Sequence, residues 1–265
     1  MINKKDNIQI IIPMTGYGSR FKSAGYKTLK PFIEVNGHSI IEWAVKMFPG
    51  DEDKIVFICR KKHLDTLSYV KRELNRIAPN ANIFAIDNWE KKGPINDVLR
   101  AEKIIDNDGQ VLISYCDYYM HWDYLTFKKE VKERDCDGSI PCYSDFHPHL
   151  IPQKNLYATC KVDSNENLIE IREKYFWGND KNKCRHSPGV YYFKTGAILK
   201  KYSREMIEAE DCIEGEYYSS LPFNYLVKAG LKVWCPVNVF YFCQWGTPED
   251  LKEFQRGVDY VNFAP

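Results

Sequence analysis

In the first half of the chain, short apolar runs of the strand type alternate with stretches in which apolar residues recur every three or four positions. The runs predict buried strands at residues 8–13, 54–59, 82–86 and 110–115. The helical spacing predicts helices at residues 39–48, around 64–77 and at 95–105. Strands separated by helices are typical of a mostly parallel sheet with helices on both faces, so we expect an α/β, Rossmann-like fold.

The second half of the chain has shorter and less regular elements. Short strands, antiparallel or mixed, are predicted at residues 137–142, 155–162, 167–173 and 188–193. Residues 176–187 are rich in Asn, Lys and Asp, which predicts a mobile loop. Residues 216–228 predict a helix that ends near Gly230, and a final strand region follows at 231–242. No repeat, low-complexity tract or linker divides the sequence, so we expect residues 1–265 to form a single domain.

Composition narrows the classes of function. The formal net charge of +1 argues against a nucleic-acid partner, which would normally need a marked basic excess. No segment approaches the ~20 apolar residues of a membrane span, and the N-terminal residues lack the apolar core of a signal peptide, so we expect no membrane partner. The nine cysteines are an odd number and several lie in apolar runs, which indicates reduced thiols in a cytoplasmic protein.

The first strand runs into a turn that contains Gly16 and Gly18 and is followed by Arg20. Glycines let the backbone approach a ligand closely, and the N–H groups of such a turn can bind an anion. A second cation, Lys30, stands directly before a proline, and Asp117 follows a strand that ends at the same edge of the predicted sheet. Position 21 is not glycine and no G-K-[ST] follows, so the dinucleotide fingerprint and the P-loop are both absent. The pattern predicts a site for a nucleoside polyphosphate.

Several segments, taken in order, resemble the nucleoside-diphosphate-sugar pyrophosphorylases and related sugar-phosphate nucleotidyltransferases. These open with P-A-A-G-x-G-x-R, followed by K-P before an apolar run and V-x-G. The opening matches are Gly16, Gly18, Ser19, Arg20, Lys30, Pro31, Val35 and Gly37. The later matches are the strand ending in Asp117, the segment ending in Glu173-Lys174, the strand that begins at Gly189, and G-T-P-E-D-L at residues 246–251. The resemblance implies the nucleotide-diphospho-sugar transferase fold, with a nucleotide-binding half at 1–135 and an acceptor half at 136–265.

The resemblance also implies a role for each matched position. Arg20 and Lys30 would be catalytic: Arg20 would hold the departing β- and γ-phosphates, and Lys30 would contact the α-phosphate as charge develops there. The nucleotide would be bound by Met14, Thr15, Gly16, Gly18, Ser19, Lys30, Gly93 and Asp117. The acceptor substrate would be bound by Ala158, Glu173, Lys174 and Gly189, with Lys174 on its phosphate and Glu173 on its hydroxyls. Asp117 would coordinate Mg²⁺, a hard cation that prefers carboxylate and phosphate oxygens.

The implied reaction needs no protein nucleophile. A phosphate oxygen of a phosphorylated sugar, polyol or amino alcohol attacks the α-phosphorus of a nucleoside triphosphate and expels pyrophosphate. Both reactants are polyanions, so the task of the protein is positioning and charge neutralisation. In the family, the activated products feed capsule and other surface-polysaccharide biosynthesis. Oligomers are common there, so the resemblance is consistent with a homo-oligomer.

Departures from the family pattern leave alternatives open. Gln244 stands where a second metal carboxylate is usual, so it is the candidate for a weaker second contact to Mg²⁺. Ala158 replaces a glycine of the substrate loop, which indicates a nonstandard acceptor. A metal-dependent glycosyltransferase of related fold is one alternative, although it would usually carry a D-x-D triplet, and two tyrosines follow Asp117. A non-catalytic nucleotide-binding relative is the other, because Gln244 removes a charge from the site.

Overall fold

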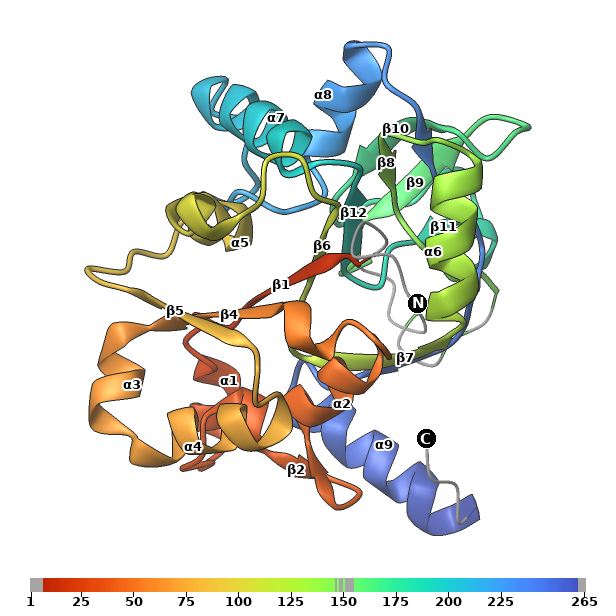
Figure 1. Ribbon diagram of the computed structural model, residues 1–265. Helices are drawn as coiled ribbons and strands as arrows, with labels where there is room; N and C mark the ends of the chain where they lie inside the picture. Colours follow the sequence, from red (N-terminus) through yellow and green to blue (C-terminus); the bar gives the residue numbers. More distant parts are fainter. Residues whose placement is uncertain (1–6, 146, 148–149, 151–154, 262–265) are drawn as a thin grey trace.

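The computed structural model describes residues 7–145, 147, 150 and 155–261. A seven-stranded sheet in the order β13-β8-β12-β6-β1-β4-β5 forms its centre (Figure 1). Its strands are β1 (Gln9–Pro13), β4 (Ile55–Arg60), β5 (Asn82–Ile86), β6 (Val111–Ser114), β8 (Gly138–Ser139), β12 (Val190–Phe193) and β13 (Val233–Trp234). Neighbouring strands are parallel except at β12, which runs antiparallel to both β6 and β8. The prediction of a mostly parallel, mixed sheet is confirmed.

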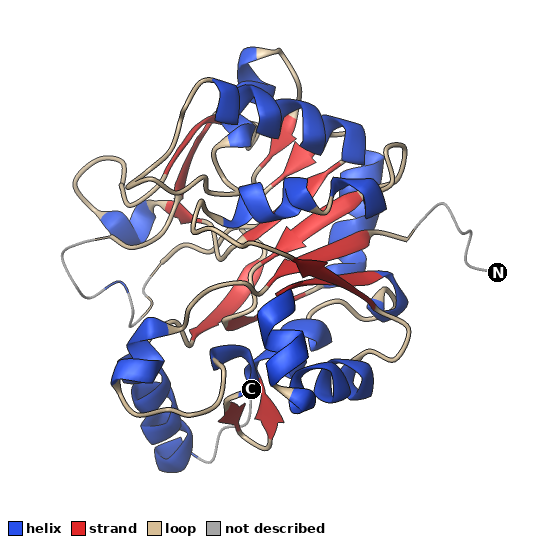
Figure 2. Cartoon of the chain, turned by 90° about the vertical axis from the view of Figure 1, so that its left-hand side faces the viewer, coloured by secondary structure: helices blue, strands red, loops and turns tan. Residues whose placement is uncertain are grey.

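Helices cover both faces of this sheet, as Figure 2 shows. They are α1 (Ser19–Ser23), α2 (Ile40–Lys46), α3 (Lys61–Thr66), α4 (Ser68–Ile77), α5 (Pro94–Arg100), α6 (Tyr124–Glu133), α7 (Gly196–Glu208), α8 (Pro222–Lys228) and α9 (Pro248–Val261). Within the described ranges, no helix is both long enough and apolar enough to cross a membrane.

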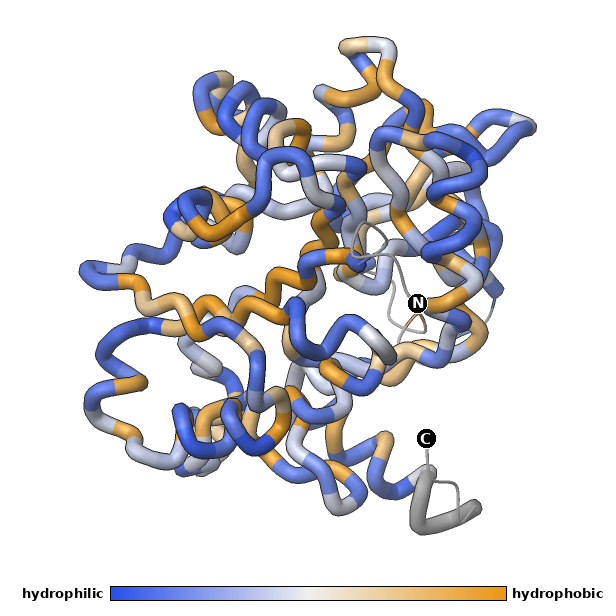
Figure 3. The backbone as a smooth tube through the Cα atoms, in the orientation of Figure 1, coloured by the Kyte–Doolittle hydropathy of each residue, from blue (hydrophilic) through white to orange (hydrophobic). Residues whose placement is uncertain are grey.

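Side chains of the central strands alternate between the two faces, as pleated strands require. In β1, Ile10 and Ile12 pack in one hydrophobic core, whereas Ile11 packs in the other. Helices α2, α4 and α6 close the first core, and α5, α7 and α8 close the second. Figure 3 shows hydrophobic colouring along β1 and β4 through the middle of the molecule. Burial on both faces explains why these strands appear in the sequence as unbroken apolar runs.

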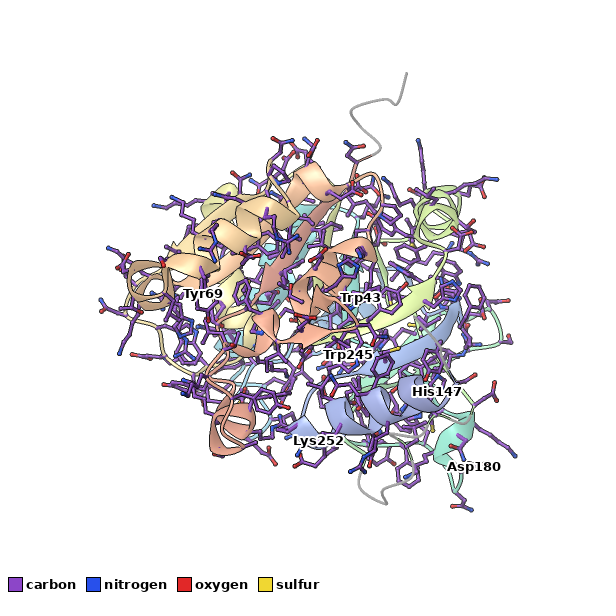
Figure 4. The ribbon with its side chains drawn as sticks, turned by 90° about the horizontal axis from the view of Figure 1, so that it is seen from below. Trp43, Tyr69, His147, Asp180, Trp245 and Lys252 are labelled. Atoms are coloured by element: carbon purple, nitrogen blue, oxygen red, sulfur yellow. The ribbon has the colours of Figure 1, made fainter. Side chains whose placement is uncertain are left out.

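Smaller sheets lie beside the central one. Strand β9 (Thr159–Val162) pairs with β10 (Leu168–Arg172) and β11 (Arg185–His186), and β7 (Tyr118–Trp122) pairs antiparallel with β14 (Val239–Gln244). A third hydrophobic cluster joins α1, α2 and α9 to the end of β14. Its members include Phe21, Trp43, Cys243, Leu251 and Trp245, which directly follows β14. Trp43 and Trp245 are labelled in Figure 4. This cluster ties the C-terminal helix to the segment that follows β1.

Several predicted elements differ from the observed ones. The helix expected around 64–77 is two helices, α3 and α4, because the backbone at Leu67 leaves the helical region (φ −121°, ψ 87°). The helix expected at 95–105 ends at Arg100, before the 3₁₀ turn η4 (Glu102–Ile104). The helix expected at 216–228 begins only at Pro222. The loop expected at 176–187 contains the 3₁₀ turn η6 (Lys181–Lys183) and β11.

Candidate active site

A cleft of about 480 Å³ opens where β1 and β6 end, at the carboxyl edge of the parallel strands. Every residue that the sequence predicts to bind nucleotide lines this cleft, and so do both predicted catalytic residues. They are Met14, Thr15, Gly16, Gly18, Ser19, Arg20, Lys30, Gly93 and Asp117. In a parallel sheet the segments that follow adjacent strands meet at one edge, so β1 and β6 bring these distant parts of the sequence together.

Lys30 and Asp117 form an ion pair inside the cleft. The Nζ atom of Lys30 lies 2.7 Å from Oδ2 of Asp117 and donates a second hydrogen bond, of 3.2 Å, to the carbonyl of Gly246. Only 15% of the Lys30 side chain is exposed, against 36% for Asp117. The ammonium group is therefore fixed in place, while the carboxylate remains accessible from the cleft.

The glycine turn folds directly against Lys30. Gly18, which precedes α1, has a φ of +59°, and a Cβ atom placed on it would lie 3.4 Å from the Cβ of Lys30. Arg20 lies in α1, exposed, and within the described residues it has no ion-pair partner. The turn thus places a free guanidinium and a fixed ammonium on one wall of the cleft, an arrangement suited to a polyanion.

The loop before α5 is held tightly by a segment from the second half of the chain. Tyr217 donates its backbone N–H to the carbonyl of Lys92 at 2.8 Å and accepts from the N–H of Ile95 at 3.2 Å. Lys91 forms an ion pair of 2.6 Å with Glu216. A Cβ atom on Gly93 would lie only 2.4 Å from the backbone nitrogen of Tyr217, so this position requires glycine.

The residues predicted for the acceptor substrate lie outside the lining of this cleft. Glu173 and Lys174 instead line a second, more open cavity of about 590 Å³. Lys174 is ion-paired with Glu214. Ala158 is buried, and Gly189 lies against the ring of Tyr115, which does line the cleft that contains Lys30.

Glu173 is a predicted acceptor residue whose carboxyl group has a perturbed pKa. Its carboxylate accepts a hydrogen bond from the hydroxyl of Ser220. Burial nevertheless raises the pKa of Glu173 from 4.5 to about 7, because a carboxylate loses hydration in this position.

Replacing Glu173 by glutamine tests the effect of this burial. The folded-state pKa lies above the unfolded one, so Glu173 favours folding most below about pH 4.5 and loses that advantage as the pH rises through 7. We expect the unfolding free energy of the wild type to fall, relative to Glu173→Gln, by on the order of 2 kcal/mol across this window. Urea unfolding at a series of pH values measures the difference. Glu253→Gln, at an exposed position on α9, is the control. If the difference in unfolding free energy between the wild type and Glu173→Gln did not change with pH, the raised pKa of Glu173 would be contradicted.

Gln244 has a clear structural role. Its Nε2 atom donates to Oδ2 of Asp250 at 2.8 Å, and the same oxygen accepts from the backbone N–H of Thr247 at the start of α9. The backbone N–H of the next residue, Trp245, donates to the carbonyl of Asp117 at 3.1 Å. The Gln244 backbone therefore lies beside Asp117, while its amide helps to cap a helix.

A scan against models of known protein families gives no match, and neither does a sequence search of curated proteins. Solved structures do match. The nucleoside-diphosphate-sugar pyrophosphorylase from Vibrio cholerae RC9 aligns over 93% of this chain and 99% of that chain, with a TM-score of 0.73 and 20% identity. The inositol-1-phosphate CTP transferase from T. maritima aligns over 96% and 97%, with a TM-score of 0.68 and 14% identity. A UDP-glucose pyrophosphorylase complexed with UDP-glucose aligns over 96% and 99%, with a TM-score of 0.70 and 14% identity.

The chain has the fold of the sugar-phosphate nucleotidyltransferases. The likeness extends over nearly its whole length, although few residues are identical. The predicted fold is confirmed.

The sequence reasoning missed a group of side chains at this cleft, Asp97, Trp89 and Arg60. Asp97 and Trp89 line the cleft, and Arg60 lies beside them with its guanidinium against the Trp89 ring. The available signal was weak: Asp97 follows the polar residue Asn96 in a short helix that begins at Pro94. Acidic residues in helices are usually solvated, so the spacing alone did not mark Asp97.

Proposed function

We propose that this protein is a nucleotidyltransferase that joins a nucleoside triphosphate to the phosphate of a sugar, polyol or amino alcohol and releases pyrophosphate. The observation that carries the proposal is the cluster of Lys30, Asp117, Arg20 and the glycine turn in one cleft. It stands at the carboxyl edge of a parallel sheet, where α/β folds bind ligands. The resemblance further suggests that the product is an activated precursor for a surface polysaccharide.

The cluster suits the electrostatic demands of this reaction. Two polyanions must approach each other, so the largest obstacle is repulsion between them. Lys30, held between Asp117 and the Gly246 carbonyl, would neutralise the charge that grows on the α-phosphate. Arg20 is exposed and would bind the leaving β- and γ-phosphates. Because Lys30 is already positioned, little reorganisation is needed during the reaction.

The accessible carboxylate of Asp117 fits a magnesium ion. Mg²⁺ is commonly bound through one or two carboxylates together with substrate phosphates, so a single protein carboxylate in the cleft is sufficient. The described residues contain no cluster of three or more His, Cys, Asp or Glu side chains that could hold a metal unaided. When bound, Mg²⁺ would supply positive charge to the phosphates and orient them. Asp117 would thus serve both Lys30 and the metal.

The second half of the chain would bind the acceptor. We propose that Glu173 and Lys174, in the open cavity next to α8, approach the acceptor when it enters. The sheet combines β1, β4, β5 and β6 from residues 1–135 with β8, β12 and β13 from residues 136–265, which supports a single domain with two functional halves.

Release of pyrophosphate, measured with Mg²⁺ and panels of nucleoside triphosphates and phosphorylated acceptors, tests the proposal. Release that requires a phosphorylated acceptor is the expected result. Transfer of a sugar from a ready-made nucleotide sugar would instead identify a glycosyltransferase, and tight nucleotide binding without turnover would identify a non-catalytic relative. Either outcome would overturn the proposed reaction.

Asp117→Asn tests the metal assignment. Loss of the carboxylate charge should raise the Mg²⁺ concentration needed for half-maximal turnover by on the order of tenfold or more, because a neutral amide binds Mg²⁺ weakly. Titration of pyrophosphate release against Mg²⁺ measures the shift. Asp108→Asn, an exposed carboxylate away from the cleft, is the matched control and should leave the titration unchanged. An unaltered metal requirement in Asp117→Asn would remove this residue from the metal site.

A further inference from the structure

Asp97 is a buried carboxylate in the wall of the nucleotide cleft. It lies in α5, has only 2% of its surface exposed, and lines the cleft together with Thr15 and Trp89. Oδ2 accepts hydrogen bonds from the Thr15 hydroxyl and from Nε1 of Trp89, the latter at 3.0 Å. Oδ1 is also buried, and among the described residues it has no hydrogen-bond partner. One oxygen of this carboxylate is therefore saturated, and the other is left as an acceptor without a donor.

The neighbouring cations do not supply that donor. Arg60 donates its Nε–H to the carbonyl of Thr15, and Arg100 donates to the carbonyls of Asp87 and Asn88. No ion pair involves Asp97 in the part of the chain that the structure describes. Burial accordingly raises the pKa of Asp97, because its charge is poorly solvated. A buried acceptor of this kind is unfavourable unless a ligand brings a donor to it.

The position of Asp97 is fixed by aromatic packing. The guanidinium of Arg60 lies 3.6 Å from the centre of the Trp89 ring and 4.0 Å from that of Tyr17. The two rings meet edge to face with centroids 5.0 Å apart. This stack holds the Trp89 N–H against Oδ2, so the free oxygen, Oδ1, is held in one orientation. A fixed acceptor discriminates between ligands better than a mobile one, because it cannot turn away from a mismatched group.

Electrostatics decides which part of a nucleotide can approach Asp97. A carboxylate repels phosphate groups. Arg20 and Lys30 lie in other segments of the cleft, and Lys91, in the loop before α5, is already paired with Glu216. The uncharged base is the part that can bring N–H groups to Oδ1. Guanine, cytosine and adenine each carry an exocyclic amino group, whereas uracil and thymine place a carbonyl oxygen on each side of their ring N–H. If that ring N–H donates to Oδ1, the two flanking oxygens also approach the carboxylate and are repelled by its negative charge.

We propose that Asp97 selects nucleobases that carry an exocyclic amino group and rejects uracil and thymine. This inference rests on the proposed function, since it assigns the nucleotide to the same cleft. Guanine satisfies Oδ1 best, because its ring N–H and its amino group are adjacent donors. A site built around a buried polar group discriminates strongly against a ligand that brings mismatched polar groups to it, here the two carbonyl oxygens of uracil or thymine.

Calorimetric binding of GTP, CTP, ATP, UTP and dTTP to the full chain with Mg²⁺ tests this directly. The tightest ligand should be one of the first three, and it should bind at least about tenfold more tightly than UTP and dTTP. Inosine triphosphate, which differs from GTP only by the missing amino group, should bind more weakly than GTP. Preference for UTP or dTTP would overturn the inference and leave the proposed function standing. Binding of no triphosphate would contradict the proposed function, and the inference with it.

Two variants separate base selection from a merely structural role. In Asp97→Asn the amide can donate to a base carbonyl, so the preference over UTP should shrink to about threefold or less. In Trp89→Phe a smaller aromatic ring remains and the donor to Oδ2 is lost, so the preference should persist even if all affinities change together. If Asp97→Asn kept the wild-type preference over UTP, or if both variants lost that preference, the carboxylate would only support the loop before α5. The comparison of ligands with the wild-type chain remains decisive if either variant fails to fold.

Discussion

Lys30→Ala should lower the rate of pyrophosphate release by on the order of a hundredfold or more while the protein remains folded. The ammonium is largely buried, with 15% of its side chain exposed, and is held by Asp117 and by the Gly246 carbonyl. It is therefore preorganised for charge that develops during the reaction, which is where such groups have their largest effect. Single-turnover and steady-state assays with the preferred triphosphate measure the loss.

Two companion variants make this result specific. Lys27→Ala removes an exposed cation three residues earlier in the chain and should leave turnover unchanged. Lys30→Arg keeps the charge but not the compact ammonium geometry, so it should recover only part of the rate. Circular dichroism checks that each variant is folded. If Lys30→Ala turned over at the wild-type rate, Lys30 would have no part in catalysis.

Of the variants proposed here, Gly93→Ala should lose the most in unfolding free energy and in nucleotide affinity taken together. The added Cβ would lie 2.4 Å from the backbone nitrogen and 2.6 Å from the backbone oxygen of Tyr217, and the φ of +94° is itself unfavourable for alanine. Backbone atoms cannot rotate out of the way, so the loop before α5 must separate from Tyr217 and its two hydrogen bonds. We expect a loss of roughly 2–4 kcal/mol in unfolding free energy and at least about tenfold weaker nucleotide binding.

Gly178→Ala is the matched control for this prediction. Gly178 also has a positive φ, +72°, but a Cβ there would have no atom within 4 Å. It therefore measures the cost of the backbone conformation alone, which should be about 1 kcal/mol. Urea unfolding and calorimetric nucleotide binding compare the two variants. If both variants lost the same unfolding free energy and the same nucleotide affinity, the close contact between Gly93 and Tyr217 would contribute to neither.

The central strands could be predicted because burial on both faces leaves a simple signature. The runs in β1 and β4 contain apolar residues at nearly every position, and parallel pairing follows from the helices between them. The grouping of Lys30, Asp117 and the glycine turn in one cleft could also be predicted, since these residues follow strand ends that must share one edge. Lys30 and Asp117 are 87 residues apart, yet their places in the βα alternation bring them together.

Other elements depend on tertiary packing that the sequence does not display. Helix α7 buries Leu199, Tyr202 and Met206 at helical spacing behind the N-cap Thr195, so its signal was present but was not recognised. Strands β8 and β13 are only two residues long, because each pairs with its neighbouring strand over only two residues. A run of apolar residues cannot reveal that limit.

Side-chain direction accounts for the remaining differences. Glu173 and Lys174 occupy a matching motif, but Lys174 has a φ of +54° and its ammonium is paired with Glu214. Both residues line a cavity separate from the cleft that contains Lys30, and their role in binding the acceptor stays a prediction. Asp97 is the opposite case, because its burial depends on Thr15, 82 residues earlier in the chain. The partners in both contacts, Lys174 with Glu214 and Asp97 with Thr15, are far apart in the sequence, so residue spacing cannot predict either contact.

The hydrogen bond from Lys30 to the Gly246 carbonyl spans 216 residues of sequence. During synthesis, the N-terminal strands can begin to form long before that acceptor has left the ribosome. The ammonium therefore gains its final partner only at a late stage, when β14 docks on β7. A shortened chain that stops before this strand could bury an apolar interior and still lack a competent centre, so the ability to hold a triphosphate would report that synthesis has passed Gly246.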